Sequence, residues 1–354
     1  MMMKGGLRMR KRLVALLCCA AIFLCSCVQE TATVTPRKSK LAPPFAPLTE
    51  IRAGRKNIYI VVKDLESGYW KVVLDGAKDA GENLNCNIYY SGTYAESDWD
   101  LQADLLDDAV KAKADAVLIS PDDSVRLASK VSEVYNKGIP VILVDTTANT
   151  EDYTVCYMTD NLVAGQRAAE EMMEIMHRKG HADTDPVQIG IIVNTLGSQT
   201  VNERLAGFFQ YWTSNAPESW QIVTDIPCFE GTAAETVPYV EELLERHPDI
   251  TGLYGTNFNT SSGIAKAVED NGRKDLGVVG FDASDEILKL IRSADYEAST
   301  IIQRQYDMSY NGVRAALNII NGEQVTVKYV ESSVLIVNRE TLPTMIVQNV
   351  LNRN

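Results

Sequence analysis

The sequence predicts an α/β protein of two doubly wound domains, each built on a parallel sheet. Short β-branched runs alternate with segments of helical periodicity along most of the chain. The number of alternations suits two sheets better than one, and 354 residues with 45% hydrophobic content can form two cores. Polar side chains also gather where strands are expected to end, which is where open parallel sheets bind ligands.

The unit at residues 57–90 shows the pattern most clearly. An apolar β-branched run at 58–62 is followed by a polar turn at 63–70, which contains two aromatic residues. One apolar helical face comes next, and residues 85–90 return to strand character. A strand that returns parallel needs a helical crossover, so the turn at 63–70 lies at the ligand-binding end of the sheet.

The same alternation continues through the rest of the chain. Further strands are expected at residues 116–120, 141–144, 155–158, 188–194, 221–226, 250–254, 277–281 and 299–303, with an extended stretch at 325–337. Helices are expected at residues 101–112, 125–136, 162–179, 200–212, 232–246, 261–271, 285–293 and 308–321. Asp160 and Asn161 can cap the helix that follows them.

Charge and motif content exclude several classes of function. The net charge is -13, and the first 26 residues carry basic but no acidic side chains, so the remainder is more acidic still. Such a surface repels nucleic acid, and we expect no nucleic-acid partner. Walker A, G-x-S-x-G and H-E-x-x-H motifs are absent, and Gly68 is the only glycine of the first turn. We therefore expect no cofactor and no metal site.

The N-terminal residues 1–26 have the features of an export signal. A basic stretch precedes an apolar run that is too short to span a bilayer, and the run ends in Leu24-Cys25-Ser26-Cys27. This tetrad resembles a bacterial lipobox and predicts a lipoprotein acylated at Cys27, with Cys25 as a weaker choice and a plain secretory signal as the alternative. Residues 27–55 are rich in Thr, Pro and Lys without periodicity, which predicts a disordered tether.

Candidate ligand-binding residues come from the expected strand ends. They are Glu66, Ser67, Tyr69, Trp70, Asp145, Thr146, Arg204, Asn257, Asp282 and Gln303. Carboxylates, amides and an arginine suit a neutral polyhydroxylated ligand, and flat aromatic faces can stack on its C–H surface. Structural roles remain open: Asp145 and Asp282 as helix caps, Arg204 as a surface ion pair, and the two aromatics as core residues.

Ordered motifs across residues 56–337 resemble the type I periplasmic sugar-binding proteins of the ribose-, galactose- and xylose-binding group. The motifs are IYIVVKDLESGYW, LISPDDS, IPVILVDTT, TDN at 159–161, NERLAGF, LYGTNFNTSSGIAKAV, VVGFDAS and STIIQ. The resemblance implies the periplasmic-binding-protein type I fold, in which a three-stranded hinge joins two lobes. The N-terminal lobe would comprise 56–159 and 304–333, and the C-terminal lobe 160–303 and 334–345.

The resemblance also implies a function. It predicts a monomeric, non-enzymatic, extracytoplasmic receptor, anchored to the membrane through its lipid, that delivers a sugar to the permease subunits of an ABC importer. The family's ligand-contact positions fall on Ser67, Tyr69, Trp70, Asp145, Thr146, Arg204, Asn257, Asp282 and Gln303, with an aromatic contact near Phe229.

The chain departs from the ribose-type pattern at three places. Glu66-Ser67-Gly68 stands where two asparagines and a proline are usual, Thr146 replaces an arginine, and Phe258 replaces an acid. A lost arginine and an added Glu66 make the pocket more acidic. We therefore expect another aldose, a sugar alcohol or an amino sugar rather than ribose.

Three other functions compete with this one. A sensor that reports to a membrane histidine kinase or chemoreceptor would use the same pocket. A secreted α/β enzyme would need a nucleophile–base pair or a metal cluster, whereas His177, His181 and His247 all fall beside helix ends. A repressor of the same fold is excluded by the missing helix-turn-helix and by the export signal.

Overall fold

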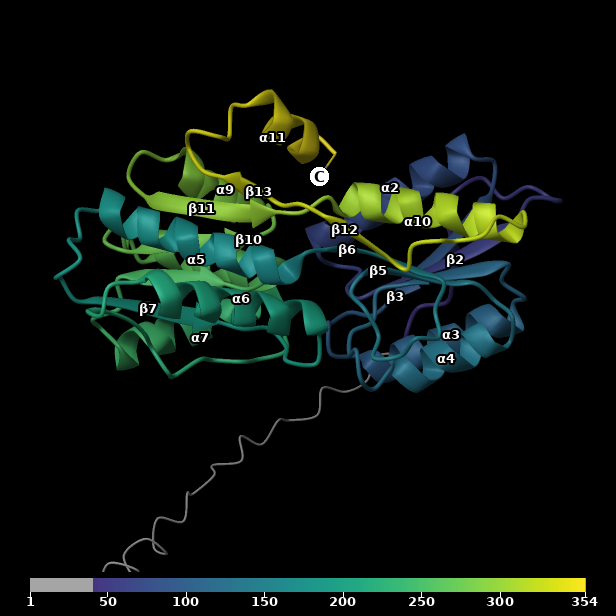
Figure 1. Ribbon diagram of the computed structural model, residues 1–354, viewed down its shortest axis with the longest axis horizontal. Helices are drawn as coiled ribbons and strands as arrows, with labels where there is room; N and C mark the ends of the chain where they lie inside the picture. The colour runs from purple at the N-terminus through teal and green to yellow at the C-terminus, as the bar shows by residue number, and fades with distance from the viewer. Residues whose placement is uncertain (1–40, 354) are drawn as a thin grey trace, which may run out of the picture. The chain divides into compact units, whose positions relative to one another are not determined.

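The computed structural model describes residues 41–353, whose strands form two mainly parallel sheets (Figure 1). The first sheet has the order β1-β3-β2-β4-β5-β6-β12, with β1 (Ala46–Pro47), β2 (Asn57–Val62), β3 (Asn87–Gly92), β4 (Ala116–Ile119), β5 (Val141–Asp145), β6 (Val155–Thr159) and β12 (Tyr329–Ser332). The second has the order β13-β11-β10-β9-β7-β8, with β7 (Val187–Ile192), β8 (Trp220–Ile222), β9 (Gly252–Gly255), β10 (Gly277–Phe281), β11 (Glu297–Ile302) and β13 (Leu335–Val337). Only β1 and β13 pair antiparallel among these strands.

Helices cover both faces of the first sheet and complete the N-terminal lobe. They are α2 (Gly68–Asn83) and α10 (Gln305–Ile320) on one face, and α3 (Trp99–Lys111) and α4 (Ala128–Asn136) on the other. Side chains along β2 alternate between the two cores: Ile58 and Ile60 pack beneath α2 and α10, whereas Tyr59 and Val61 pack beneath α3. This two-sided burial explains why the strand is apolar throughout.

The C-terminal lobe repeats this layering around the second sheet. One face carries α5 (Asn161–Arg178) and α6 (Gln199–Asn215), and the other carries α7 (Ala233–Arg246), α8 (Phe258–Asp270) and α9 (Asp285–Arg292). The last helix, α11 (Met345–Leu351), buries Val347 in the core of the second face. The predicted fold class of two doubly wound α/β domains is therefore confirmed.

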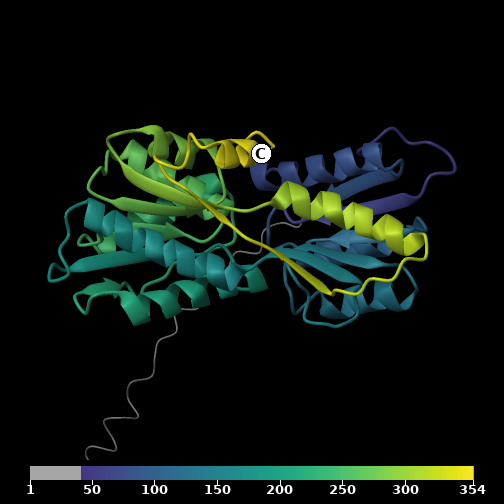
Figure 2. The same cartoon turned by 45° about the horizontal axis from the view of Figure 1, so that its top comes forward.

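The described chain passes between the two sheets three times. It leaves β6 at Thr159 and starts α5, whose first-turn Val163 amide donates to the Asp160 carboxylate. It returns after β11 through Gln303, and it crosses again between β12 and β13 (Figure 2). Because the chain crosses three times, each lobe is built from segments that are distant in the sequence. Two of the connections lie side by side, since the Asp160 amide donates to the Ser332 carbonyl at 3.4 Å.

The predicted tether is wrong over its C-terminal part. Ala46 and Pro47 pair antiparallel with β3, the Leu48 amide donates to the Ile88 carbonyl at 2.8 Å, and the Ile88 amide donates to the Thr49 hydroxyl at 3.0 Å. A two-residue strand gives no periodicity, and proline is tolerated because β1 is an edge strand. Cys27 and the other leader and tether residues up to 40 lie outside the described residues.

Two further features differ from the sequence predictions. Helix α2 begins at Gly68, so Tyr69 and Trp70 belong to its first turn rather than to the preceding loop. Helix α11 was not predicted, because seven residues are too few for a periodic signal. Within residues 41–353 no helix has both the length and the apolar character needed to cross a bilayer.

Candidate functional site

A small cavity lies between the lobes, at the carboxyl ends of the strands of both sheets. Its lining residues are Lys63, Tyr69, Trp70, Glu96, Asp145, Thr200, Val201, Arg204, Asn257, Phe258, Asp282 and Gln303. Its free volume is about 20 Å³, which is room for about one water molecule, so the lobes as they lie leave less space than a ligand-binding pocket has. The position follows the rule for open α/β sheets, because loops after the strands of both lobes converge there.

Asp145 ends β5, and each of its carboxylate oxygens accepts a hydrogen bond from within the N-terminal lobe. Its Oδ1 accepts from the Tyr69 hydroxyl at 2.5 Å, its Oδ2 accepts from the Thr146 hydroxyl at 2.6 Å, and Lys63 Nζ lies 3.6 Å from Oδ2. Burial and the charge of Asp145 raise the pKa of Tyr69, so the phenol stays protonated and remains the donor. Asp145 therefore presents an oriented, charged acceptor at the cavity wall.

Asp282 takes the same place at the end of β10 in the C-terminal lobe. Both aspartates adopt positive φ, 70° for Asp145 and 68° for Asp282, a conformation that aspartate tolerates better than most residues. Gln303 Nε2 donates to Asp282 Oδ1 at 2.8 Å, and Gln303 Oε1 accepts from the Thr159 hydroxyl at 2.7 Å. Thr159 and Gln303 lie on two of the crossing segments, so this chain of hydrogen bonds ties the site to the hinge.

Burial gives Asp282 an unusual acidity. Its carboxyl is almost inaccessible to solvent, and burial raises its pKa to about 7 against the opposing charge of Arg204. The side chain is therefore near its titration point at neutral pH. It can accept or donate a hydrogen bond at little electrostatic cost.

Arg204 is held rigidly before any ligand arrives. Its Nε donates to Asn161 Oδ1 at 2.8 Å, its Nη1 donates to the Thr256 carbonyl at 2.9 Å, and its guanidinium lies 3.7 Å from the centre of the Phe281 ring. These contacts leave part of the guanidinium available to the cavity that Arg204 lines.

Five cavity-lining residues were not named as individual candidates from the sequence, although Lys63 belongs to the turn predicted at the ligand-binding end: Glu96, Lys63, Thr200, Val201 and Phe258. Glu96 lies in the loop after β3, and Trp70 Nε1 donates to its Oε1 at 3.0 Å. Lys63 directly follows β2 and donates to the Ser198 hydroxyl of the other lobe at 3.1 Å. The strand-end rule that selected Asp145 applies equally to Lys63 and could have found it, whereas Glu96 lies inside a loop, where the rule does not choose among residues.

Four predicted ligand-binding residues are not brought to the cavity. Glu66 is exposed, and Ser67 is buried at the start of α2. Thr146 is buried behind Asp145, and Phe229 stacks on Tyr239 in the C-terminal core with 4.2 Å between ring centres. The expectation that Glu66 makes the pocket acidic is therefore corrected: the additional acid is Glu96.

The lobes touch directly along the rim of the cleft. The Ser124 amide donates to the Gly197 carbonyl at 3.0 Å, and the Gln199 amide donates to the Ser124 hydroxyl at 3.1 Å. Together with the bond from Lys63 to Ser198, these contacts close the space between the lobes. The structure thus represents a closed arrangement.

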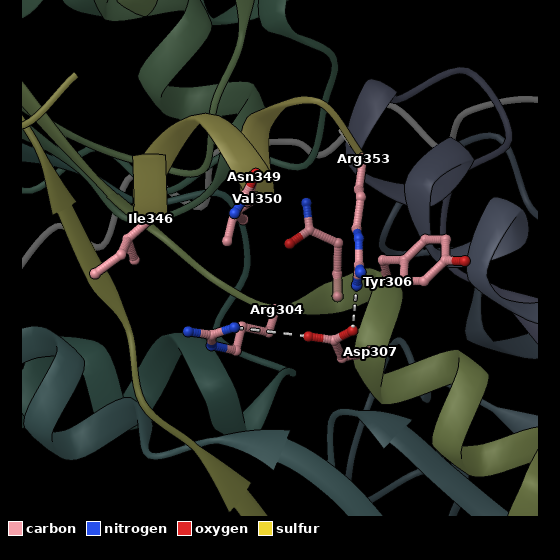
Figure 3. A pocket seen from close by; sticks show the side chains of 8 residues that line it. Arg304, Tyr306, Asp307, Ile346, Asn349, Val350 and Arg353 are labelled. Carbon is pink, nitrogen blue, oxygen red and sulfur yellow. Dashed lines mark hydrogen bonds and ion pairs between the residues drawn. The ribbon is translucent and has the colours of Figure 1, made fainter. Parts of the chain in front are cut away.

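A second hollow lies on the hinge side, between the start of α10 and α11 (Figure 3). Asp307 accepts from Arg353 Nη1 at 2.9 Å and lies 3.7 Å from Arg304 Nη1, while the Arg353 guanidinium lies 5.0 Å from the centre of the Tyr306 ring. One carboxylate is thus shared by two guanidinium groups. At this hollow the end of the chain after α11 contacts the N-terminal lobe through the Arg353–Asp307 ion pair. The cleft cavity remains the better candidate for a ligand.

Comparison with known proteins identifies the family. Residues 58–324 match the model of the periplasmic binding protein domain. The chain belongs to the periplasmic binding proteins. This periplasmic binding protein is 27% identical to the ribose import binding protein RbsB of Bacillus subtilis over 232 residues, which are 65% of this chain and 71% of that protein. It is 26% identical to the D-apiose import binding protein of Actinobacillus succinogenes over 283 residues, which are 78% and 86% of the two chains.

Solved structures are similar over nearly their whole length. A carbohydrate transporter solute-binding protein from Agrobacterium radiobacter, in complex with D-arabinose, superposes with a TM-score of 0.80 at 27% identity, covering 85% of this periplasmic binding protein and all of that chain. An ABC transporter solute-binding protein from Agrobacterium vitis with bound D-fucose has a TM-score of 0.75 at 27% identity, covering 83% and 99%. These similarities extend across both lobes, so they include the cleft.

Proposed function

We propose that this periplasmic binding protein captures a monosaccharide or related polyol in the cleft cavity and delivers it to an ABC importer. One observation carries the proposal: each lobe contributes an oriented aspartate from a strand end, Asp145 and Asp282, to one small cavity. Two oriented carboxylates on opposite walls can each accept from ring hydroxyls, and the ligand then joins the lobes. The sugar-import names of the relatives support the same assignment.

The chemistry of the remaining wall supports a neutral, hydroxyl-rich ligand. Arg204 and Asn257 supply donors, and Trp70 and Phe258 supply apolar ring surface. With Glu96 in the wall and Thr146 beside Asp145, we propose an aldose other than ribose, a sugar alcohol or an amino sugar. Binding is proposed to occur without chemical conversion, because the relatives are named as import binding proteins.

The proposal includes a location and an anchor. Family membership supports an extracytoplasmic folded body, and the Leu24-Cys25-Ser26-Cys27 tetrad supports a lipid on Cys27. We propose that the protein is a monomer. Detergent phase partitioning tests the anchor: the protein expressed in a bacterial host should enter the detergent phase, and the Cys27→Ser variant should not. Partitioning of both proteins into the aqueous phase would refute the anchor.

Titration calorimetry with the full-length protein tests the function. The panel contains D-ribose, D-allose, D-apiose, D-arabinose, D-fucose, xylitol and D-glucosamine. We expect one of them to bind, and Asp282→Ala to abolish that binding while thermal unfolding remains cooperative. Tight binding of D-ribose alone would contradict the proposed ligand class, and absence of all binding would contradict the function.

A further inference from the structure

Glu96 differs from the other carboxylates of the cleft in the partners it has. Its Oε1 accepts from Trp70 Nε1 at 3.0 Å, and its Oε2 accepts from Asn194 Nδ2 and Asn257 Nδ2, both at 3.3 Å. All three donors are neutral. Within residues 41–353 no basic side chain forms an ion pair with Glu96, whereas Asp145 lies beside Lys63.

The two asparagines belong to the opposite lobe. Asn194 follows β7, and Asn257 caps α8, so the Glu96 carboxylate reaches across the cleft from the loop after β3. A ligand in the cavity therefore meets this charge in the closed state, where the surrounding protein screens it less than water would.

The charge of Glu96 is felt by neighbouring acids. Burial is the main cause that raises the pKa of Asp282 to about 7 and that of Asp64 to about 6, and the negative charge of Glu96 adds to both effects. Of the two cations that line the cavity, Lys63 is paired with Asp145, whereas Arg204 bonds only to neutral groups of Asn161 and Thr256, and its charge opposes the effect of burial on Asp282.

We propose that Glu96 is a specificity-determining residue that excludes anionic sugar derivatives from the cleft. The inference rests on the proposed sugar-binding function and names the ligand class more narrowly. A neutral hydroxyl or a protonated amine can donate to the Glu96 carboxylate. A uronate or a sugar phosphate would instead place a second anion beside the Glu96 carboxylate, whose three hydrogen-bond donors are all neutral.

The test compares neutral sugars with uronates that carry an added carboxylate on a related ring. The pairs are D-fucose with D-galacturonate and D-xylose with D-glucuronate, measured by calorimetry and by competition on the full-length protein. We expect the wild-type protein to bind one of the neutral sugars and to bind the paired uronate at least about 100-fold more weakly. The Glu96→Gln variant should reduce this ratio of affinities at least about tenfold.

Two variants control for structural effects. Glu96→Asp keeps the charge and should keep the discrimination even if overall affinity falls, and Glu66→Gln removes an exposed acid that does not line the cavity and should change nothing. A purely structural role of Glu96 would weaken both ligands equally and leave the ratio unchanged.

The outcomes separate this inference from the proposed function. If the wild type binds no neutral sugar, the proposed function fails, and the inference fails with it. If the wild type binds a neutral sugar but binds the uronate equally well, only the inference is overturned, whether or not the variants fold. An unchanged ratio in a folded Glu96→Gln variant would also overturn it.

Discussion

The Tyr69 hydroxyl donates to Asp145 Oδ1 at 2.5 Å, and this bond joins the first turn of α2 to the end of β5. Both side chains are buried, and the acceptor is a carboxylate. Charge-assisted bonds of this kind are shorter and stronger than neutral ones. The bond therefore fixes the orientation of a cleft carboxylate from within the N-terminal lobe.

Tyr69→Phe should lower the free energy of unfolding by about 1.5–3 kcal/mol, because it leaves one oxygen of a buried carboxylate without its donor. Urea unfolding at neutral pH measures the change. Tyr310→Phe is the matched control, because the Tyr310 hydroxyl accepts from the side-chain Nδ2 of Asn83 in an exposed contact at 3.5 Å. We expect this variant to change the free energy of unfolding by no more than about 0.5 kcal/mol. Equal effects of the two variants would contradict a special role for the Tyr69–Asp145 bond.

The raised pKa of Asp282 predicts how stability varies with pH. Folding raises the pKa of this carboxyl from 3.8 to about 7, so the folded state holds the proton more tightly than the unfolded state. Its contribution should therefore lower the free energy of unfolding progressively as pH rises from about 4 to about 7, by up to about 4 kcal/mol.

Unfolding curves of the wild type and Asp282→Asn over this pH range measure that contribution. The variant cannot titrate, so the difference between the two proteins should change with pH in favour of the variant as pH rises. Asp64, with a pKa raised to about 6, contributes with the same sign in both proteins and cancels in the difference. A difference that does not vary with pH would show that Asp282 has an ordinary pKa.

Much of the cavity could be predicted from the sequence because of one geometric rule. In a parallel sheet all strands end at the same edge, so Asn257 and Asp282 are brought together in the second sheet, and the facing edge of the first sheet adds Asp145. The same rule fails inside loops. Glu66 and Glu96 both follow strands, and only packing of the second loop against Trp70 selects Glu96 as the cavity acid.

Other misses have local physical causes. Phe229 has the residue type of an aromatic ligand contact, but its ring stacks on Tyr239 of α7, a pairing that depends on how an irregular loop meets a helix. The strand β1 has two residues, one of them proline, and exists because the edge of β3 offers it hydrogen-bonding groups. Neither feature produces a periodic pattern in the sequence.

The segment before β2 provides a stability prediction. Thr49→Val should lower the free energy of unfolding by about 1–3 kcal/mol, because the buried Ile88 amide would lose its acceptor. Thr49→Ser keeps the hydroxyl and should cost less, which thermal unfolding can measure. If residues 41–55 were a free tether, both variants would unfold like the wild type.

Arg204 is positioned by the close approach of two helices. Helices α5 and α6 approach so closely that a Cβ on Gly165 would lie 2.0 Å from the Arg204 carbonyl oxygen. Because the obstacle is backbone, the helices must move apart. Gly165→Ala should therefore lower the free energy of unfolding by about 1–3 kcal/mol, and sugar affinity should fall at least about tenfold as the guanidinium shifts from Asn161 and Phe281.

Gly138→Ala separates this effect from ordinary loss of a glycine. Gly138 has a φ of 82°, and a Cβ added there would meet no atom within 4 Å, so its replacement should cost about 1–2 kcal/mol in backbone strain and leave affinity unchanged. Calorimetry and urea unfolding of both variants give the comparison. A Gly165→Ala protein that binds sugar like the wild type would mean that Arg204 is not a ligand contact, because its backbone cannot stay in place beside the added methyl group.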